Sequence, residues 1–385
     1  MKTIAKILKW FIGIVVLIVL AFYITGYDYI FKGIRVVYFT GHTTAFIDDY
    51  TYFDNRSIEN GNPKLVPQHK DYNSAEIPEE LEKSNQKFGT VAFLIFKEGK
   101  LWYEKYYEGY GPDSQTNSFS MAKSISTLLL GKAIEDGFIS SLNQKVVDFF
   151  PELKGEFADQ LTVGDLSSMA SGLNWNENYY SPFSMTAQSY YDENIRDLIL
   201  SLAVDEKPAQ SFQYLSGNTQ LLGMVLEKAV GKNISLYLSE NFWKPMGMEA
   251  NAYWQLDSQE SGMEKTYCCI ASNARDFAKI GLMVMNKGKW NGKQILNQEF
   301  IEKCIQPRFE QDTEYGYGFW LEKHQGKDVF AMQGILGQYV IGIPEDDVLI
   351  VRLGHQREVK QPGEGFTSDF YDYLEGAYQM LSDTP

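Results

Sequence analysis

A serine and a lysine three residues apart, Ser120 and Lys123, stand at the start of a stretch with the apolar spacing of a buried helix. Residues three apart share one face of a helix, so the lysine amine would lie beside the serine oxygen. Burial disfavours the charged amine and lowers its pKa, and a neutral lysine can then take the proton of a serine hydroxyl. The stretch therefore predicts an enclosed helix that carries a nucleophile and its base in the first turn.

The same spacing occurs a second time in the chain, at Ser84 and Lys87. That copy lies in a run of charged residues, which indicates a solvated surface. The copy at Ser120 is followed by apolar residues at helical spacing and then by Gly137, where the helix is expected to end. We therefore assign the chemistry to Ser120. The apolar positions are Ile125, Leu128, Leu129, Ala133 and Ile134.

Histidines are too few and too scattered to suggest another kind of site. None of the four has metal-ligand spacing to another or a triad-like setting. We therefore expect no metal and no organic cofactor, and a lysine becomes the better candidate for the base. The four are His42, His69, His324 and His355.

Three cysteines leave their pairing open. Cys268, Cys269 and Cys304 cannot form a disulfide framework, and no CxxC pair suggests zinc or redox chemistry. We interpret the adjacent Cys268 and Cys269 as packing residues. One disulfide to Cys304 is the alternative in an oxidising compartment.

The first 27 residues are predicted to cross a membrane. Lys2, Lys6 and Lys9 precede an uncharged apolar run over 10–24, which is long for a signal-peptide core and has no small-residue cleavage site after it. Lysines before such a run favour an N-terminus in the cytoplasm. We expect a single-pass signal anchor in a bacterial-type cytoplasmic membrane, with the domain on the outer side. Secretion after cleavage is the alternative.

The rest of the chain is acidic, because the formal net charge is −15 and no acid occurs before Asp28. Such a charge argues against nucleic acid or anionic lipid as a partner. The expected partners are a small-molecule substrate and, through the N-terminal helix, the membrane. The sequence leaves the oligomeric state open.

Strands are expected near both ends of the main domain, with helices between them. The expected strands cover residues 90–96, 101–108, 329–333, 338–343 and 348–353. A mostly helical section over about 142–288 separates the two groups, and a last amphipathic helix covers about 368–381. The pattern predicts an α+β fold whose antiparallel sheet is built from both chain ends.

The chain is accordingly divided into three parts. Residues 1–27 form the N-terminal signal anchor, and residues 28–88 form an extended arm, polar and rich in aromatic residues, with little periodicity. Residues 89–385 form the main domain, which carries Ser120 and Lys123. We expect the arm to lie on the surface of that domain.

A lysine base needs partners, and two further segments supply candidates. Tyr214 and Ser216 lie on a loop that follows Pro208 and precedes an apolar helix. A phenol close to an ammonium can titrate low enough to shuttle protons, although a tyrosine at a helix start commonly only packs. Further along, Gly334 follows a strand, and a glycine there lets a substrate lie against the strand edge beside an oxyanion-binding N–H. A plain turn is the alternative.

Together these motifs resemble those of the serine β-lactamase and penicillin-binding-protein superfamily. The resemblance is closest to class C β-lactamase-like serine hydrolases of the 6-aminohexanoate-dimer hydrolase type. It implies a β-lactamase/transpeptidase-like fold, with the antiparallel sheet flanked by helices beside a mostly helical subdomain; in this chain one transmembrane helix precedes it. The resemblance begins near residue 89 and includes the segments 161–173, 242–248, 271–281 and 315–320.

The resemblance also implies a role for each motif residue. Ser120 is the acylated nucleophile, Lys123 is the base that activates it, and Tyr214 is the proton relay to the leaving group. The backbone N–H groups of Ser120 and Ile335 form the oxyanion hole. The implied substrate contacts are Tyr179, Ser216, Gln333 and Gly334.

Two departures from the family pattern restrict the range of expected substrates. Ser216 stands where the relatives carry an asparagine, and Met332-Gln333-Gly334 replaces their Lys-Thr-Gly. The second change removes a cation, and an unpaired substrate carboxylate in a partly desolvated cleft costs on the order of a few kcal/mol. We therefore predict a serine hydrolase of the esterase or amidase type that cleaves a neutral ester or amide. The alternatives are a penicillin-binding or weak β-lactamase-type protein and a catalytically silent envelope sensor of the same fold.

Overall fold

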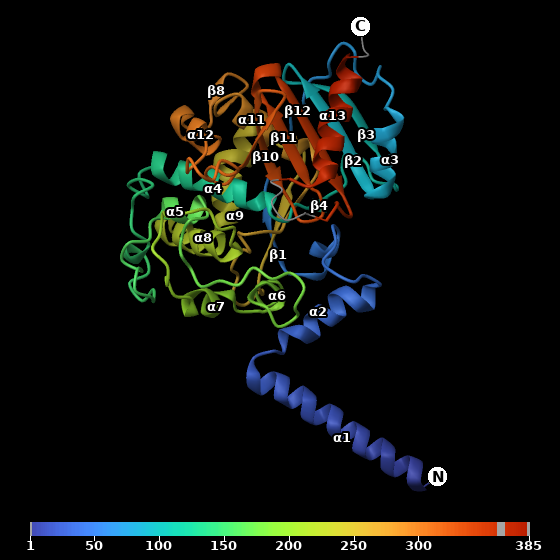
Figure 1. The fold of residues 1–385 in the computed structure, drawn as a ribbon, viewed down its shortest axis with the longest axis vertical. Helices are drawn as coiled ribbons and strands as arrows, with labels where there is room; N and C mark the ends of the chain where they lie inside the picture. The colour runs from blue at the N-terminus through green and yellow to red at the C-terminus, as the bar shows by residue number, and fades with distance from the viewer. Residues whose placement is uncertain (1, 360–365, 383–385) are drawn as a thin grey trace.

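The largest sheet of the protein is built from both ends of the main domain (Figure 1). The computed structural model describes residues 2–359 and 366–382. The six strands are all antiparallel, in the order β3-β2-β12-β11-β10-β9, which confirms the predicted α+β fold. The strands are β2 (Thr90–Lys97), β3 (Lys100–Tyr106), β9 (Trp320–His324), β10 (Lys327–Gln333), β11 (Tyr339–Ile343) and β12 (Val348–Gly354).

Helices cover both faces of this sheet. On one face a Cβ added to Gly281 of α11 would touch Leu349 of β12. On the other face Phe370 of α13 packs in one cluster with Phe93 and Tyr339. Because both faces are covered, β2 and β12 are buried along nearly all of their length and read as continuous apolar runs. The helices are α3 (Glu79–Lys87), α11 (Ala274–Met285) and α13 (Ser368–Ser382).

The helix that follows Ser120 is enclosed, as its apolar pattern predicts. α4 (Met121–Glu135) is buried over almost its whole length and contacts both β10 and α8 (Ser216–Val230). Gly137 follows its end with a φ of 79°, a left-handed conformation that glycine adopts at little cost. The first turn of α4 therefore sits at the junction between the main sheet and the helical subdomain (Figure 1).

The middle of the chain contains the helical subdomain, and four short strands between residues 55 and 272 form a second sheet that the sequence did not predict. This sheet has the order β1-β5-β6-β4. Its strands are only two to four residues long, too short to give a recognisable alternation of apolar and polar residues. The strands are β1 (Asn55–Ile58), β4 (Thr116–Asn117), β5 (Ala252–Gln255) and β6 (Ile270–Ser272), and the further helices are α5 (Val163–Ser167), α6 (Met185–Tyr191), α7 (Ile195–Ser201), α9 (Ile234–Leu238), α10 (Lys244–Met246) and α12 (Gln298–Cys304).

The N-terminal region contains more regular structure than the predicted extended arm. α1 (Lys2–Thr25) is apolar and long enough to cross a membrane, and it extends away from the rest of the protein (Figure 1). α2 (Tyr29–Val37) follows it and lies against α6, where a Cβ on Gly33 would touch the ring of Tyr191. β1 and α3 also belong to this region, so it is packed into the domain by two helices and a strand. Their short lengths explain why no periodicity stood out.

The second Ser-x-x-Lys segment lies in α3 and does not bring its serine and lysine together. Ser84 Oγ donates to Asp372 at 2.7 Å, and Lys87 Nζ pairs with Glu358 at 2.6 Å. Leu81 of the same helix is buried against α13. The charged side chains of α3 therefore face outward or toward the C-terminal helix.

Candidate functional site

Ser120 and Lys123 face each other in the first turn of α4. Lys123 Nζ lies 3.0 Å from Ser120 Oγ and donates to the carbonyl oxygen of Tyr267 at 2.8 Å. The lysine side chain is 2% exposed. Burial lowers the pKa of Lys123 to about 8, and the negative charge of Glu177 opposes this shift. The amine is therefore partly neutral near physiological pH and lies within reach of the serine proton.

The backbone before α4 fixes the direction of Ser120. Phe119 has a φ of 45°, which is uncommon for any residue other than glycine. Its N–H donates to Asn117 Oδ1 at 3.0 Å, and Ser118 Oγ accepts from the N–H of Ile270 at 3.1 Å. These contacts extend the β4–β6 pairing up to the serine. The short strand β4, which the sequence did not reveal, thus positions Ser120.

The N-terminal region holds the same turn from the other side through Asp49. Asp49 is fully buried and accepts from Asn117 Nδ2 at 3.0 Å and from the Tyr190 hydroxyl at 2.7 Å. Burial raises the pKa of Asp49 to about 6, although the two hydrogen bonds lower it. No sequence motif pointed to this residue. Residues 28–88 therefore help to hold the turn before Ser120 in place, through the bond from Asn117 to Asp49.

Tyr214 lies over Lys123, with the lysine nitrogen 5.0 Å from the centre of the phenol ring. It is hydrogen-bonded to Ser120. Burial raises the pKa of Tyr214 above its ordinary value, and the bond to Ser120 lowers it only in part. This direction is opposite to the lowering that we expected from a neighbouring ammonium, because desolvation is the largest cause of the shift.

Glu177 binds both Tyr179 and Ser216, two of the predicted substrate contacts. Its carboxylate accepts from Ser216 Oγ at 2.7 Å, from the Ser216 N–H at 2.6 Å and from Trp175 Nε1 at 2.7 Å. The Tyr179 hydroxyl donates to it as well. Ser216 and Tyr179 therefore give their protons to Glu177 and offer a substrate only acceptor oxygens. Sequence reasoning missed Glu177, although it lies between Trp175 and Tyr179 in the segment already considered.

The end of β10 lies against the turn that carries Ser120. A Cβ on Gly334 would come within 2.7 Å of the Ser118 carbonyl oxygen, so this position requires glycine. The backbone N–H groups of Ser120 and Ile335 donate to no acceptor within residues 2–359 and 366–382. The buried Gln333 Oε1 likewise has no hydrogen-bond partner among the described residues. Two donors and one acceptor are thus left for another molecule.

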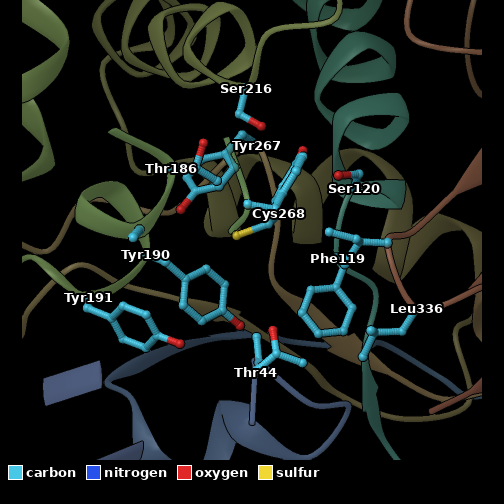
Figure 2. Close-up of a pocket in the computed structure, with 14 residues that line it drawn as sticks. Thr44, Phe119, Ser120, Thr186, Tyr190, Tyr191, Ser216, Tyr267, Cys268 and Leu336 are labelled. Atoms are coloured by element: carbon cyan, nitrogen blue, oxygen red, sulfur yellow. The ribbon is translucent and has the colours of Figure 1, made fainter. Parts of the chain in front are cut away.

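Ser120, Tyr179, Ser216 and Ile335 line a cavity of about 130 Å³, called the serine pocket below. Thr44, from the N-terminal region, lies across it from Ser216 (Figure 2). The aromatic rings of Phe119, Tyr190 and Tyr191 give it a largely apolar wall (Figure 2). The lining residues are Thr44, Ala45, Phe119, Ser120, Tyr179, Thr186, Ala187, Tyr190, Tyr191, Ser216, Tyr267, Cys268, Ile335 and Leu336.

A second opening, called the outer cleft below, also reaches Ser120 and shares Thr44, Tyr179, Ile335 and Leu336 with the serine pocket. Arg357 lines it together with Tyr214, Trp320 and Gln333. In the described ranges Arg357 forms no ion pair, and its charge lowers the pKa of Tyr214. Sequence reasoning missed this cation, because it lies more than twenty residues beyond the position of the missing Lys-Thr-Gly motif.

The cysteines adopt an arrangement that the sequence did not suggest. Cys268 and Cys269 form a disulfide with each other, and Cys304 is free and buried. The alternative of a disulfide to Cys304 is therefore wrong. Cys268 lines the serine pocket beside Tyr267, whose carbonyl holds Lys123.

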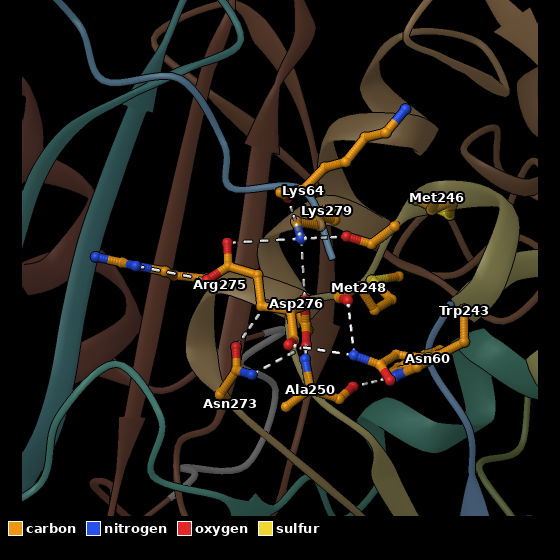
Figure 3. A network of polar contacts seen from close by, with 12 residues as sticks. Asn60, Lys64, Trp243, Met246, Met248, Ala250, Asn273, Arg275, Asp276 and Lys279 are labelled. Carbon is orange, nitrogen blue, oxygen red and sulfur yellow. Dashed lines mark hydrogen bonds and ion pairs between the residues drawn. The ribbon is translucent and has the colours of Figure 1, made fainter. Parts of the chain in front are cut away.

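Two of the segments that resemble the family form a buried polar network (Figure 3). Asp276 of α11 accepts from the N–H groups of Glu249 and Ala250 at 2.7 and 3.1 Å. Lys279 pairs with Asp276 at 3.2 Å and donates to the carbonyl oxygens of Gly247 and Lys64, each at 2.9 Å. The network joins segments 242–248 and 271–281 to the N-terminal region. These segments therefore support the scaffold rather than the chemistry.

Replacing Asp276 by Ala is expected to lower the free energy of unfolding by about 3 kcal/mol. The change leaves Lys279 buried with less compensation and removes the acceptor of two backbone N–H groups. Urea denaturation of the full chain in detergent measures the effect. Asp113→Ala, at an exposed position, is the control and should change stability by less than about 0.5 kcal/mol. A loss below about 1 kcal/mol for the Asp276 variant would contradict the structural role.

Comparisons with known proteins agree with this architecture. A 6-aminohexanoate-dimer hydrolase from Paenarthrobacter ureafaciens is 24% identical over 297 residues, which are 71% of this chain and 74% of that protein. The solved structure of a putative 6-aminohexanoate-dimer hydrolase from Bacillus anthracis superposes with a TM-score of 0.72 at 22% identity. The superposition covers 86% of this chain and 90% of that one. A family VIII carboxylesterase gives a TM-score of 0.60 at 18% identity, covering 79% of this chain and 98% of that one.

The family model described as Beta-lactamase matches residues 74–367. The match begins in the N-terminal region, close to α3, and includes the turn of Ser120, the loop of Tyr214 and the end of β10. Because it covers well over half of the chain, and because the solved relatives have the same fold, this protein belongs to the Beta-lactamase family.

Proposed function

We propose that the protein is a membrane-anchored serine hydrolase that forms an acyl-enzyme on Ser120 and cleaves an ester or an amide. The observation that carries this proposal is the 3.0 Å contact between Ser120 Oγ and the nitrogen of a buried lysine whose pKa is lowered to about 8. A neutral amine at this distance is the base that a serine nucleophile needs. The hydrolase names of several relatives are consistent with the same chemistry.

Acylation uses groups that already surround Ser120. The serine oxygen attacks the substrate carbonyl carbon while its proton passes to Lys123, and the carbonyl oxygen becomes an oxyanion held by the N–H groups of Ser120 and Ile335. When the tetrahedral intermediate collapses, Tyr214 donates a proton to the departing alcohol or amine and regains one from the Lys123 ammonium. Water then attacks the ester on Ser120 by the reverse of these transfers and releases the acid.

The surrounding side chains orient the substrate. Tyr179 and Ser216 present acceptor oxygens from the Glu177 side, and Gln333 and Gly334 border the strand edge along which the substrate would lie. We assign residues 1–27 to the membrane anchor, 28–88 to the N-terminal arm and 89–385 to the hydrolase domain. With the lysines of α1 on the cytoplasmic side, the active site lies outside the membrane.

A fluorophosphonate probe tests the nucleophile. The full chain in detergent should become covalently labelled, and Ser120→Ala should reduce labelling to background because the probe phosphorylates an activated serine oxygen. Ser84→Ala, in the other Ser-x-x-Lys segment, is the matched control and should label like the wild type. Labelling that survives in the Ser120 variant would reject the assignment.

The pH dependence of kcat/KM reports the lysine base. Because the pKa of Lys123 is lowered to about 8, the amine is protonated and inactive below that pH and neutral above it. We expect kcat/KM for a p-nitrophenyl ester to rise about tenfold per pH unit below about 8 and to level off above it. An activity that rises only near the ordinary lysine pKa, or that falls through pH 8, would contradict Lys123 as the base.

A second candidate function is favoured by Arg357. The prediction of a neutral substrate rested on the loss of the Lys-Thr-Gly cation, but this arginine supplies a positive charge in the outer cleft beside Gln333. A guanidinium pairs well with a carboxylate. A penicillin-binding or weak β-lactamase-type activity is therefore the second candidate, and a stable adduct with penicillin would support it.

A further inference from the structure

A third cavity continues the serine pocket toward the membrane helix. This cavity, the α2 groove, has a volume of about 190 Å³ and lies between α2 and residues 179–182. Thr44, Tyr179, Ala187 and Tyr191 line both cavities, so the two adjoin each other. The groove is lined by the apolar side chains of Ile30, Ile34, Val37 and Pro182 and by the rings of Tyr180 and Tyr191, while Thr43, Thr44 and Ser181 add polar atoms.

The groove opens close to the end of α1. Only three residues separate α1 from α2, and the Tyr29 hydroxyl donates to the Pro182 carbonyl at 2.9 Å, which joins α2 to the opposite wall. The Phe183 ring lies 5.3 Å from the ring of Tyr27 and 6.4 Å from the ring of Phe22 in the last turns of α1. The segment that forms one wall of the groove therefore contacts the end of the membrane helix.

Exposed aromatic residues mark this end of the protein. Tyr180 is 95% exposed and Phe183 is 56% exposed, beside the junction of α1 and α2. A helix of 24 residues is about 36 Å long, enough to cross the hydrocarbon core of a bilayer, so its end lies at the outer interface. Tyrosine and other aromatic side chains favour that depth. The mouth of the groove thus lies at the level of the lipid headgroups.

We propose that the substrate is an ester or amide amphiphile of the outer leaflet, whose apolar acyl chain occupies the α2 groove. The inference rests on the proposed hydrolase function and specifies its substrate class. The acyl carbonyl reaches Ser120, and the polar alcohol or amine part extends into the part of the outer cleft that is lined by Trp320, Gln333 and Gln356, which line neither of the other two cavities.

The reaction on such a substrate is a hydrolysis, and water is the only co-reactant that it needs. Ser120 Oγ bonds to the acyl carbon, the bond to the headgroup oxygen or nitrogen breaks, and that atom takes a proton through Tyr214. Water then splits the acyl-serine ester and releases a carboxylate with a long apolar chain. Each methylene that enters the groove is removed from water and raises kcat/KM by about fourfold until the groove is filled.

The test compares p-nitrophenyl esters from acetate to octanoate on the full chain reconstituted in zwitterionic liposomes. We expect kcat/KM to rise with chain length by at least about tenfold from butyrate to octanoate. Ile34→Trp, which fills the groove, should reduce the octanoate-to-butyrate ratio at least fivefold, and Ile30→Trp should do the same if the first variant does not fold. Arg35→Trp places the same side chain at an exposed neighbour and should leave the ratio as in the wild type.

A flat chain-length profile in the wild type, or an equal loss in the Arg35 variant, would overturn the inference. If no ester is hydrolysed at all, the proposed hydrolase function fails, but the groove can still be tested. Photo-crosslinking with a diazirine-bearing palmitate in the same liposomes then shows whether an apolar chain binds in the groove. Crosslinks on α2 and residues 180–183 that disappear in Ile34→Trp would show that an apolar chain binds there. Crosslinks confined to α1 would overturn the groove as a chain-binding site.

Discussion

Replacing Lys123 by Met is expected to lower kcat/KM for an activated ester by roughly 10²- to 10⁴-fold, the range in which a general base contributes. Methionine keeps the apolar length of the side chain and removes only the amine. In the structure that amine is the group 3.0 Å from Ser120 Oγ, and its other hydrogen bond goes to a backbone carbonyl. Without it, Ser120 has no base within reach, and acylation should be the step that slows.

Burst kinetics with p-nitrophenyl butyrate separate acylation from later steps. Lys87→Met, from the second Ser-x-x-Lys segment, is the matched control, since Lys87 pairs with Glu358 on the surface. It should retain wild-type rates. A Lys123 variant that keeps its acylation rate within a factor of about ten would show that another group takes the serine proton. Thermal unfolding of both variants checks that the fold is retained.

The second large effect is expected at Tyr214. Replacing it by Phe should lower kcat by about 10²-fold, because the ring and its packing remain while the proton for the leaving group is lost. Burial raises the pKa of this phenol, so it acts as a donor and not as a phenolate. The loss should therefore be larger for a substrate with a poor leaving group, such as an anilide, than for a p-nitrophenyl ester.

A paired series of ester and anilide substrates measures this difference. Tyr52→Phe, at an exposed position, serves as the control and should behave as the wild type. An equal loss on good and poor leaving groups would argue that Tyr214 only positions Ser120 and does not donate a proton. A variant with full activity on both would remove Tyr214 from the mechanism.

The parts of the fold that the sequence predicted have long, regular patterns. β2, β12 and the helix after Ser120 are continuous apolar runs or helical repeats, and each is covered on more than one side in the structure. The second sheet was missed because strands of two to four residues carry too few positions for a pattern. Yet β4, one of these strands, positions Ser120, so a short element carries an essential part of the geometry.

The candidate site shows the same division. Ser120 and Lys123 are close in sequence, and helical spacing alone predicts their contact. Glu177 and Arg357 act across the fold, and nothing in their local sequence distinguishes them from other charged residues. The pKa of Tyr214 depends on how completely the chain buries it. Residue spacing is enough to predict contacts between neighbours in sequence. The pKa shifts that come from burial, and the contacts between distant segments, can be predicted only from the folded structure.

The N-terminal region shows how a weakly patterned segment can matter. Asp49 is connected to the serine turn through Asn117, and Thr44 faces the serine pocket. Helix α2 then adds a groove beside the pocket, close to the end of α1. The N-terminal region therefore helps to line both cavities, whereas the sequence predicted only an arm lying on the surface of the domain.

The most direct test of the account is intact-mass spectrometry of the full chain after brief exposure to p-nitrophenyl esters, short amide oligomers and a penicillin, quenched in acid. The account predicts one acyl group per chain with an ester, located on the peptide that contains Ser120 and absent from Ser120→Ala. It further predicts that Lys123→Met slows the appearance of this adduct. An adduct that persists in Ser120→Ala, or the absence of any adduct and any turnover in the wild type, would contradict the assignment of Ser120 as an acylated nucleophile.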